Sequence, residues 1–384
     1  MGRHYLDHAS TSPARPEVVE AMLPWLSGDA AADPGRVHTE GRMARAAVEE
    51  AREQVAALLG ARAREVVFTS GATEAVNAAV WGAAQARPGA GMVCAAVEHS
   101  AVRDASRRHA AVIEPEVDGR GRIRLEAVTG LDPAGIALLH CQWGNHEVGT
   151  LQPVGEAVAW GREHGVLTHV DAAAAAGHVA VDYGALGADL LSVSAHKLGG
   201  PKGVGALVVR RGLRLAPYLV GGEQERARRG GMENVPAIVG FGAAAASLTA
   251  DGGAVLATEA ARARAQTEGL LADAAAIDGV RGYGDPRDRL PHIVCVGVGG
   301  VEAEAVLLGL DQAGIAAHSG SACSSEALDP SPVLEAMGVD AERSLRLSVG
   351  WSTTDQDIEA CAAALPRVVG RLRALVGPPG GERR

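Results

Sequence analysis

Aromatic side chains are scarce in this sequence. Of 384 residues only 3% are Phe, Trp or Tyr, whereas 47% are hydrophobic and 50 are glycine. The core must therefore be built from small aliphatic side chains. Together with a charged share of 21%, this composition is typical of a soluble globular protein, and the length predicts about two domains.

Cysteine is also scarce, and its spacing excludes two common roles. None of the five cysteines forms a Cys-x-x-Cys pair, so they predict neither a disulfide framework nor a zinc knuckle. A metal site built from His140, Cys141 and His146 has no recognisable ligand spacing, so we expect no metal. Cys94, Cys141 and Cys295 lie in apolar strand patterns and are expected in the core, and Cys361 is expected to pack in a helix.

Positive charge and long apolar runs are missing as well. Lys and Arg number 36 against 46 Asp and Glu, and the net charge of −10 argues against nucleic-acid binding, which favours a basic face. The longest nearly uncharged run, residues 235–250, is too short to span a bilayer and contains Gly and Ser. The first residues include no apolar signal-peptide segment. We therefore expect a cytoplasmic protein that binds neither membrane nor nucleic acid.

Short apolar runs alternate with Ala-rich helical segments through the first two thirds of the chain. Such alternation is typical of an α/β protein with a mostly parallel sheet of the seven-stranded type, covered by helices. The expected strands are residues 65–69, 91–96, 135–140, 166–170, 190–194 and 205–209. After residue 251 the pattern changes to a smaller α+β domain. We predict a large domain over residues 16–252 and a small domain formed by residues 1–15 and 253–384.

One lysine stands out at the end of an apolar strand. Lys197 closes Ser192–Lys197 and is followed by the Gly/Pro-rich segment 198–203. An amine in a partly desolvated pocket loses some of its preference for the charged form and becomes a nucleophile, as a Schiff-base lysine for an aldehyde cofactor requires. The alternative is a lysine that extends from a strand end to water, and the hexapeptide alone does not decide between the two.

Three other strand ends carry polar residues. Ser70–Glu74 joins a strand to a helix and offers an anion cup in which Ala72 leaves room and Thr73 supplies a hydroxyl, although a plain capping turn has the same sequence. Asp171 ends the strand before the lysine strand and could pair with a protonated ring nitrogen, or simply cap a helix. His99 could stack on a flat cofactor and move protons, or serve only as a structural hydrogen-bonding residue.

The order and wording of these segments resemble a known family. SGATE, EHS, HVDA, SAHK and GPKGVG follow one another as in the cysteine desulfurases of the NifS/IscS type, which are class V aminotransferases of PLP fold type I. The resemblance runs from Tyr5 to Arg373. It implies a pyridoxal 5′-phosphate (PLP) cofactor, L-cysteine as substrate, L-alanine as product and a homodimer. It also implies that sulfur passes to an acceptor protein.

The resemblance assigns roles residue by residue. Lys197 would hold PLP and move the Cα proton, Asp171 would keep the ring nitrogen protonated, and His99 would stack on the ring and handle protons near the substrate thiol. The expected phosphate ligands are Thr73, Ser194 and His196, and Ala72 is also expected to contact the cofactor. Arg346 and Asn145 are expected to bind the substrate, and Cys323, in the segment His318–Ser325, is expected to receive the sulfur as a persulfide. Composition alone would favour an inert cysteine there, and the alternative for Arg346 is a surface ion pair.

Three positions depart from the family pattern. His146 stands where a second Asn contacts the cofactor's ring hydroxyl, Ala174 replaces a Gln that also contacts it, and Met232 replaces a Thr that reaches the neighbouring subunit's phosphate. We expect His146 to bind the cofactor and to supply the missing donor. Two other interpretations stay open, a selenocysteine lyase or other PLP β-elimination enzyme and a degenerate scaffold. The acceptor's pathway, whether iron–sulfur assembly, tRNA thiolation or DNA sulfur modification, is not encoded in any segment that we recognise.

Overall fold

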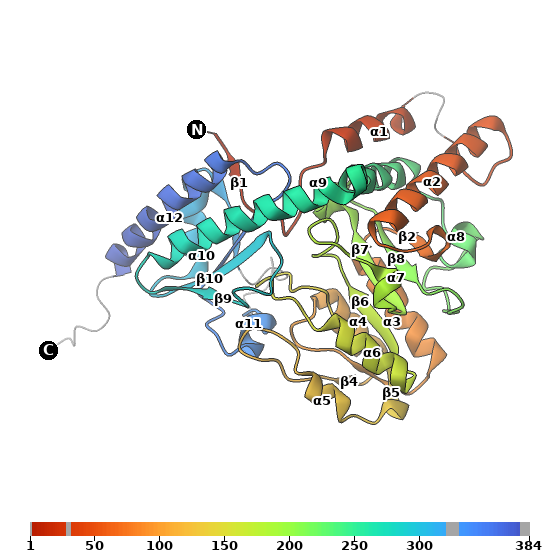
Figure 1. The fold of residues 1–384 in the computed structure, drawn as a ribbon, viewed down its shortest axis with the longest axis horizontal. Coiled ribbons are helices and arrows are strands. Elements are labelled where there is room, and N and C mark those ends of the chain that lie inside the picture. Colours follow the sequence, from red (N-terminus) through yellow and green to blue (C-terminus); the bar gives the residue numbers. More distant parts are fainter. Residues whose placement is uncertain (1, 28–31, 320–329, 377–384) are drawn as a thin grey trace.

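A seven-stranded sheet organises the larger part of the molecule (Figure 1). The structure is a computed structural model that describes residues 2–27, 32–319 and 330–376. The spatial order is β2-β8-β7-β6-β5-β3-β4, in which only β8 runs antiparallel to its neighbours. The strands are β2 (Val66–Thr69), β3 (Gly91–Val93), β4 (Val112–Ile113), β5 (Ile136–His140), β6 (Leu167–Asp171), β7 (Leu190–Ser194) and β8 (Gly205–Val209). The expected fold class is confirmed.

Helices cover both faces of this sheet because its strands are apolar on both sides. Leu190 packs in the cluster with α3 and α4, whereas the next residue, Leu191, packs in the cluster with α2 and α9. This alternation follows from the two-residue period of a strand. The helices of this part are α1 (Pro16–Leu26), α2 (Thr39–Leu58), α3 (Ala72–Ala86), α4 (Ser100–His109), α5 (Leu125–Thr129), α6 (Val154–His164), α7 (Tyr183–Leu186) and the short α8 (Gln224–Ala227).

A second, antiparallel sheet of order β12-β13-β10-β9 lies at the other end of the molecule. It packs with α10, α12 and the second half of α9 around a core of its own. The N-terminal segment joins this end through β1, which pairs with β11. The elements are β1 (His4–Tyr5), β9 (Val280–Tyr283), β10 (Ile293–Val298), α10 (Ala303–Gln312), β11 (Ile315–Ala316), β12 (His318–Ser319), α11 (Pro332–Ala336), β13 (Ser344–Ser348) and α12 (Asp355–Val376). The domain boundaries near residues 16 and 252 stay a prediction.

The long α9 (Val235–Ala275) crosses between the two parts (Figure 1). Its backbone leaves helical values over residues 250–253, where two glycines follow Asp251. Among the described helices it is the one that is long and apolar enough to cross a membrane by length and composition alone. Here Phe241, Ala244 and Leu248 on its first half are fully buried against the large sheet and its helices, so its apolar character is used in the core.

Candidate active site

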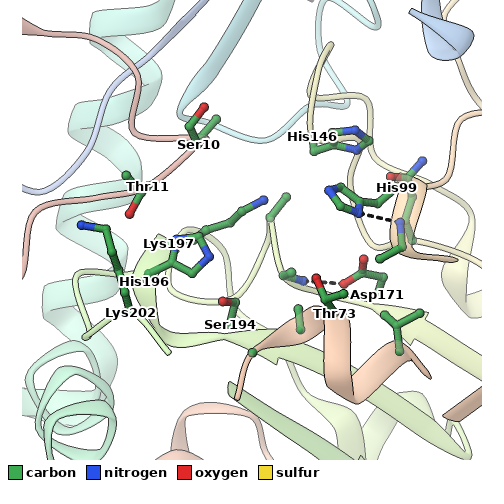
Figure 2. A pocket seen from close by; sticks show the side chains of 18 of the residues that line it. Ser10, Thr11, Thr73, His99, His146, Asp171, Ser194, His196, Lys197 and Lys202 are labelled. Atoms are coloured by element: carbon green, nitrogen blue, oxygen red, sulfur yellow. Dashed lines mark hydrogen bonds between the residues drawn. The ribbon is translucent and has the colours of Figure 1, made fainter. Parts of the chain in front are cut away.

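A cavity of about 530 Å³ opens where the parallel strands β3, β5, β6 and β7 end (Figure 2). Ligand sites of open α/β sheets form at these carboxyl ends. Nine of the predicted site residues line it together: Ala72, Thr73, His99, His146, Asp171, Ser194, His196, Lys197 and Arg346. The cavity therefore gathers side chains from segments as far apart in the chain as β13 and the start of α3.

Hydrogen bonds to its backbone carbonyl hold Lys197 in place, and its side chain enters the cavity (Figure 2). It ends a single 3-10 turn, Ala195–Lys197, that follows β7 directly. Its carbonyl accepts hydrogen bonds from Ser12 Oγ at 3.2 Å and from the His178 ring at 3.1 Å. The N-terminal segment thus braces the lysine turn from outside the large sheet.

His196 precedes the lysine and also lines the cavity. Burial, together with the charges of Lys197 and Lys202, lowers the pKa of His196 to about 4. A neutral imidazole at neutral pH can still donate one ring N–H. His196 can therefore contribute a hydrogen bond to an anion without adding a positive charge.

Asp171 ends β6 on the opposite wall of the cavity. Its Oδ1 accepts a hydrogen bond from Ala173 N at 3.0 Å and another from Ser192 Oγ at 3.0 Å. Both donors use the same oxygen, so the carboxylate is fixed in orientation by the protein on one side.

The start of α3 forms an uncapped helix terminus at the cavity. We expected helix near Glu74, but it begins at Ala72, and the N-cap Gly71 makes no side-chain cap. First-turn amides have no acceptor inside the helix, which suits them to bind an anion. Glu74 fixes this turn because its carboxylate accepts from Ser70 N at 2.8 Å and pairs with Arg229 at 2.9 Å.

Two histidines, His99 and His146, line the cavity, and the buried Glu98 precedes His99 in the chain. His99 caps α4, since its Nδ1 accepts from Ala101 N at 3.1 Å, and its ring meets the His146 ring edge-on, with centroids 5.0 Å apart. Behind them Glu98 accepts from Gln142 N at 2.7 Å. Burial raises the pKa of Glu98 to about 8, with Asp171 adding to the shift, so Glu98 is neutral at pH 7.

Arg346 connects three segments at the edge of the cavity. The guanidinium donates to the His146 carbonyl at 2.9 Å, to Asp7 Oδ1 at 3.0 Å and to Ser10 Oγ at 2.7 Å. Its side chain is 2% exposed, so the alternative of a surface ion pair is wrong. A buried, paired guanidinium that lines a cavity is suited to bind a carboxylate.

One predicted site residue that the structure describes does not line the cavity. Asn145 is fully buried behind its wall, where its amide oxygen accepts from Glu147 N and Val148 N and its amide nitrogen donates to the Val97 carbonyl. These bonds show that Asn145 holds the turn that presents His146, and its expected role in substrate binding stays a prediction. Cys323 lies outside the described residues.

The two other departures from the family pattern lie in different surroundings. Ala174 lines the cavity and is nearly buried, so the place of the missing Gln faces the site. Met232 is 66% exposed and lies in a small hollow with Ser70 and Arg229. The position of the lost Thr is thus on the surface beside the α3 terminus.

Sequence reasoning missed several residues that line the cavity. Ser10 and Thr11 come from the N-terminal segment, Gln142 from the loop after β5, and Lys202 from the turn after Lys197. Lys202 stands inside GPKGVG, and Ser10 and Thr11 lie near the N-terminal start of the family resemblance at Tyr5, so their signal was present without an assigned role. Gln142 carried no signal, because its place depends on how the loop folds back on Val97.

The four described cysteines are confirmed as buried free thiols. Burial raises the pKa of the Cys361 thiol to about 12, and it raises the pKa values of Cys94, Cys141 and Cys295 as well. Because the thiolate is the reactive form, these four side chains are inert at neutral pH. Among the described residues, no group of three or more His, Cys, Asp or Glu side chains could hold a metal ion.

Comparison with known proteins agrees with this site. The family model "Aminotransferase class-V" matches residues 4–361, and the chain belongs to this family. "Cysteine desulfurase IscS 1" of Archaeoglobus fulgidus is 40% identical over 97% of the chain and 98% of the relative. "Putative cysteine desulfurase IscS 1" of Bacillus subtilis is 40% identical over 97% of the chain and 100% of the relative.

Solved structures show the same architecture. A "NIFS-LIKE PROTEIN" superimposes with a TM-score of 0.89 at 28% identity, covering 96% of this chain and 100% of that one. "SspA in complex with cysteine" superimposes with a TM-score of 0.77 at 29% identity, covering 90% and 98%. The resemblance to cysteine desulfurases is confirmed, and neither a selenocysteine lyase nor a degenerate scaffold is favoured.

Proposed function

We propose that this protein is a PLP-dependent cysteine desulfurase that converts L-cysteine to L-alanine and passes the sulfur through Cys323 to an acceptor. The observation that carries the proposal is one cavity that holds a lysine amine, a carboxylate on the opposite wall and a buried arginine, namely Lys197, Asp171 and Arg346. Relatives with this activity match the chain over nearly its whole length.

The residues present fit the cofactor. Lys197 supplies the amine that holds it, the carboxylate of Asp171 suits a protonated ring nitrogen, and the His99 ring offers a face for stacking. The phosphate would lie at the uncapped start of α3, with hydroxyls from Thr73 and Ser194. When bound, PLP acts as an electron sink for the substrate's Cα.

The remaining polar groups orient the substrate. The Arg346 guanidinium binds the α-carboxylate, and its bonds to Asp7 and Ser10 hold it in place. The Lys197 amine takes and returns the Cα proton. Glu98, neutral at pH 7 because its pKa is raised to about 8, does not add a second negative charge beside Asp171.

Cys323 is the thiol assigned to carry sulfur. The four described cysteines are buried with raised pKa values, and the chain that leads to Cys323 leaves β12, where His318 pairs with Arg346 across the sheet. The Cys323 thiolate forms an S–S bond with the substrate sulfur, while the Cβ–S bond breaks and its electron pair stays on carbon, which is then protonated.

We also propose a homodimer. The segment that follows β8 exposes apolar side chains, with Val220 80% exposed, and Met232 lies on the same surface near the α3 terminus. Exposed apolar groups close together are typical of an interaction surface. The acceptor protein is not identified, and a cytoplasmic location stays an expectation.

Two neighbouring lysines allow a controlled test of the cofactor assignment. The purified protein is treated with borohydride in the presence of PLP, which fixes the cofactor on its lysine, and the modified peptide is found by mass spectrometry. The modification should map to Lys197 in wild type and in Lys202→Ala, and it should disappear in Lys197→Ala. Modification of Lys202 in the wild-type protein would contradict the assignment.

A further inference from the structure

A chain of buried hydrogen bonds runs behind the cavity and ends on Asp171. Ser106 Oγ lies 3.2 Å from His140 Nε2, His140 Nδ1 lies 2.9 Å from His169 Nδ1, His169 Nε2 lies 3.2 Å from Ser192 Oγ, and Ser192 Oγ lies 3.0 Å from Asp171 Oδ1. The four side chains before the carboxylate are at most 1% exposed. No role assigned above uses Ser106, His140 or His169.

Sheet order brings these side chains together. His140 on β5 pairs in register with His169 on β6, and Ser192 on β7 pairs with Asp171 on β6. Ser106 reaches the chain from α4, the helix that His99 begins. The hydrogen bonds therefore cross three adjacent strands and connect the helix behind the cavity with the carboxylate in it.

The two histidine rings supply only a few protons to this series of hydrogen bonds. Burial lowers the pKa of His140 well below its ordinary value, with His169 adding to the shift, and burial lowers the pKa of His169 to about 4. Both rings are then neutral, and each carries one N–H. The contact between the two Nδ1 atoms needs one donor and one acceptor, so the proton on one ring dictates the proton on the other.

The two ends of this hydrogen-bond chain require the hydrogen bonds between them to be donated in opposite directions. At one end, Ser106 Oγ is 2.7 Å from the Val102 carbonyl. If the Ser106 hydroxyl donates to this carbonyl, His140 must donate from Nε2 to Ser106 Oγ. Each hydrogen in the chain of bonds then points away from Asp171. At the other end, a Ser192 hydroxyl that donates to Asp171 requires His169 to donate from Nε2, which directs the order toward the carboxylate. Both demands cannot be met by two neutral rings.

The hydrogen bond to the Asp171 carboxylate is stronger than the hydrogen bond to the Val102 carbonyl. A hydrogen bond to an ionised acceptor is about twice as strong as one between neutral groups. Val102 lies inside α4, where its carbonyl is placed to accept the helical bond from the backbone four residues on, so it loses little without the Ser106 hydroxyl. Glu98, the nearby acid, is neutral at pH 7 because burial raises its pKa to about 8, and it does not oppose a negative Asp171.

We propose that Ser106, His140, His169 and Ser192 form a proton-ordered relay in which each hydrogen points toward Asp171. In this order His140 is protonated on Nδ1 and His169 on Nε2, and Ser192 donates to Asp171 Oδ1. With the Ala173 amide on the same oxygen, the relay fixes the carboxylate from behind. The four are positioning residues. Their value for catalysis rests on the proposed function, in which Asp171 faces the cofactor's ring nitrogen.

Nitrogen NMR of the histidine rings tests the order directly. The full chain is labelled with 15N-histidine, and the signals are assigned through the variants His140→Gln and His169→Gln. A ring nitrogen without a proton resonates far downfield of one with a proton, so the tautomer of each ring is read without turnover and without cofactor. Wild-type protein should show His140 protonated on Nδ1 and His169 on Nε2.

Substitutions at the two ends give a matched comparison. Ser192→Ala disconnects the carboxylate and leaves the Ser106 end to set the order, so both tautomers should reverse. Ser106→Ala removes the opposing end and should leave both tautomers as in wild type. The reversed order in the wild-type protein, three protonated nitrogens in the histidine pair, or unchanged tautomers in a folded Ser192→Ala variant would each overturn the relay. Because the measurement is independent of cofactor, the relay can fail while the proposed function stands.

Discussion

The buried ion pair between Arg52 and Glu225 gives a quantitative test of what holds the segment after β8 in place. The two guanidinium nitrogens of Arg52 lie 2.6 and 2.7 Å from the two carboxylate oxygens, and Phe68 N donates to the same carboxylate at 3.0 Å. The side chains are 3% and 2% exposed. Phe68 belongs to β2, which leads into the α3 terminus of the site.

Glu225→Gln leaves the charge of Arg52 buried without its partner. Breaking a buried pair costs about 3–5 kcal/mol, and Arg52 keeps Glu49 at 3.2 Å. Residues 225–227 all have positive φ, a strained conformation for residues other than glycine that the variant could relax. Because of both effects we expect the free energy of unfolding to fall by about 3 kcal/mol, the lower end of this range.

The neighbouring residue provides the control. Arg226 pairs with Glu49 at 3.0 Å, but both side chains are well exposed, and such pairs contribute about 0–1 kcal/mol. A chain of 384 residues that unfolds as one unit has an unfolding entropy of roughly 0.8 kcal/mol/K. Glu225→Gln should therefore lower Tm by about 4 °C and Arg226→Gln by about 1 °C or less, measured by scanning calorimetry at equal protein and cofactor concentrations. Equal shifts in the two variants would refute the reasoning.

Two further predictions concern the site. Burial alone would raise the pKa of Glu74. Hydrogen bonds from Arg229 and Ser70 outweigh burial and hold the pKa below its ordinary value. A lowered carboxyl pKa stabilises the fold fully above the unfolded pKa of about 4.5, and this contribution is lost as pH falls below it. The Tm advantage of wild type over Glu74→Gln should therefore hold above about pH 5 and shrink as pH falls below about 4.5; a constant difference would contradict it. We expect His146, which lines the cavity, to act as the donor to the cofactor's ring hydroxyl. His146→Asn should then move the pH midpoint of the bound cofactor's visible absorbance, whereas an unchanged midpoint would exclude this role.

Much of the large sheet could be predicted from the sequence because its strands are short apolar runs bounded by polar or glycine residues. The expected strands at residues 190–194 and 205–209 agree with β7 and β8 residue for residue. The start of α3 was misplaced by two residues, because Gly71 occupies the N-cap without a capping side chain and therefore gives no capping signal.

The site was predictable where one residue sits at one strand end, as for Lys197 and Asp171. Roles that depend on pairing between strands were not predictable. His140 meets His169 only because β5 and β6 are neighbours in this register, and Asn145 turns inward because its loop folds on Val97. Such contacts depend on tertiary packing, which local sequence patterns do not determine.

Labelled sulfur tests the central claim most directly. Wild-type protein loaded with PLP is given one equivalent of 35S-cysteine without an acceptor, and the label and the alanine are quantified. We expect alanine and label in equal amounts, with the label on Cys323 and released by a thiol reductant. Cys323→Ser should keep the bound cofactor's colour but form neither, while Cys361→Ala, which removes a buried thiol, should behave as wild type. Alanine formation at the wild-type rate by Cys323→Ser, or label on another cysteine, would contradict the account.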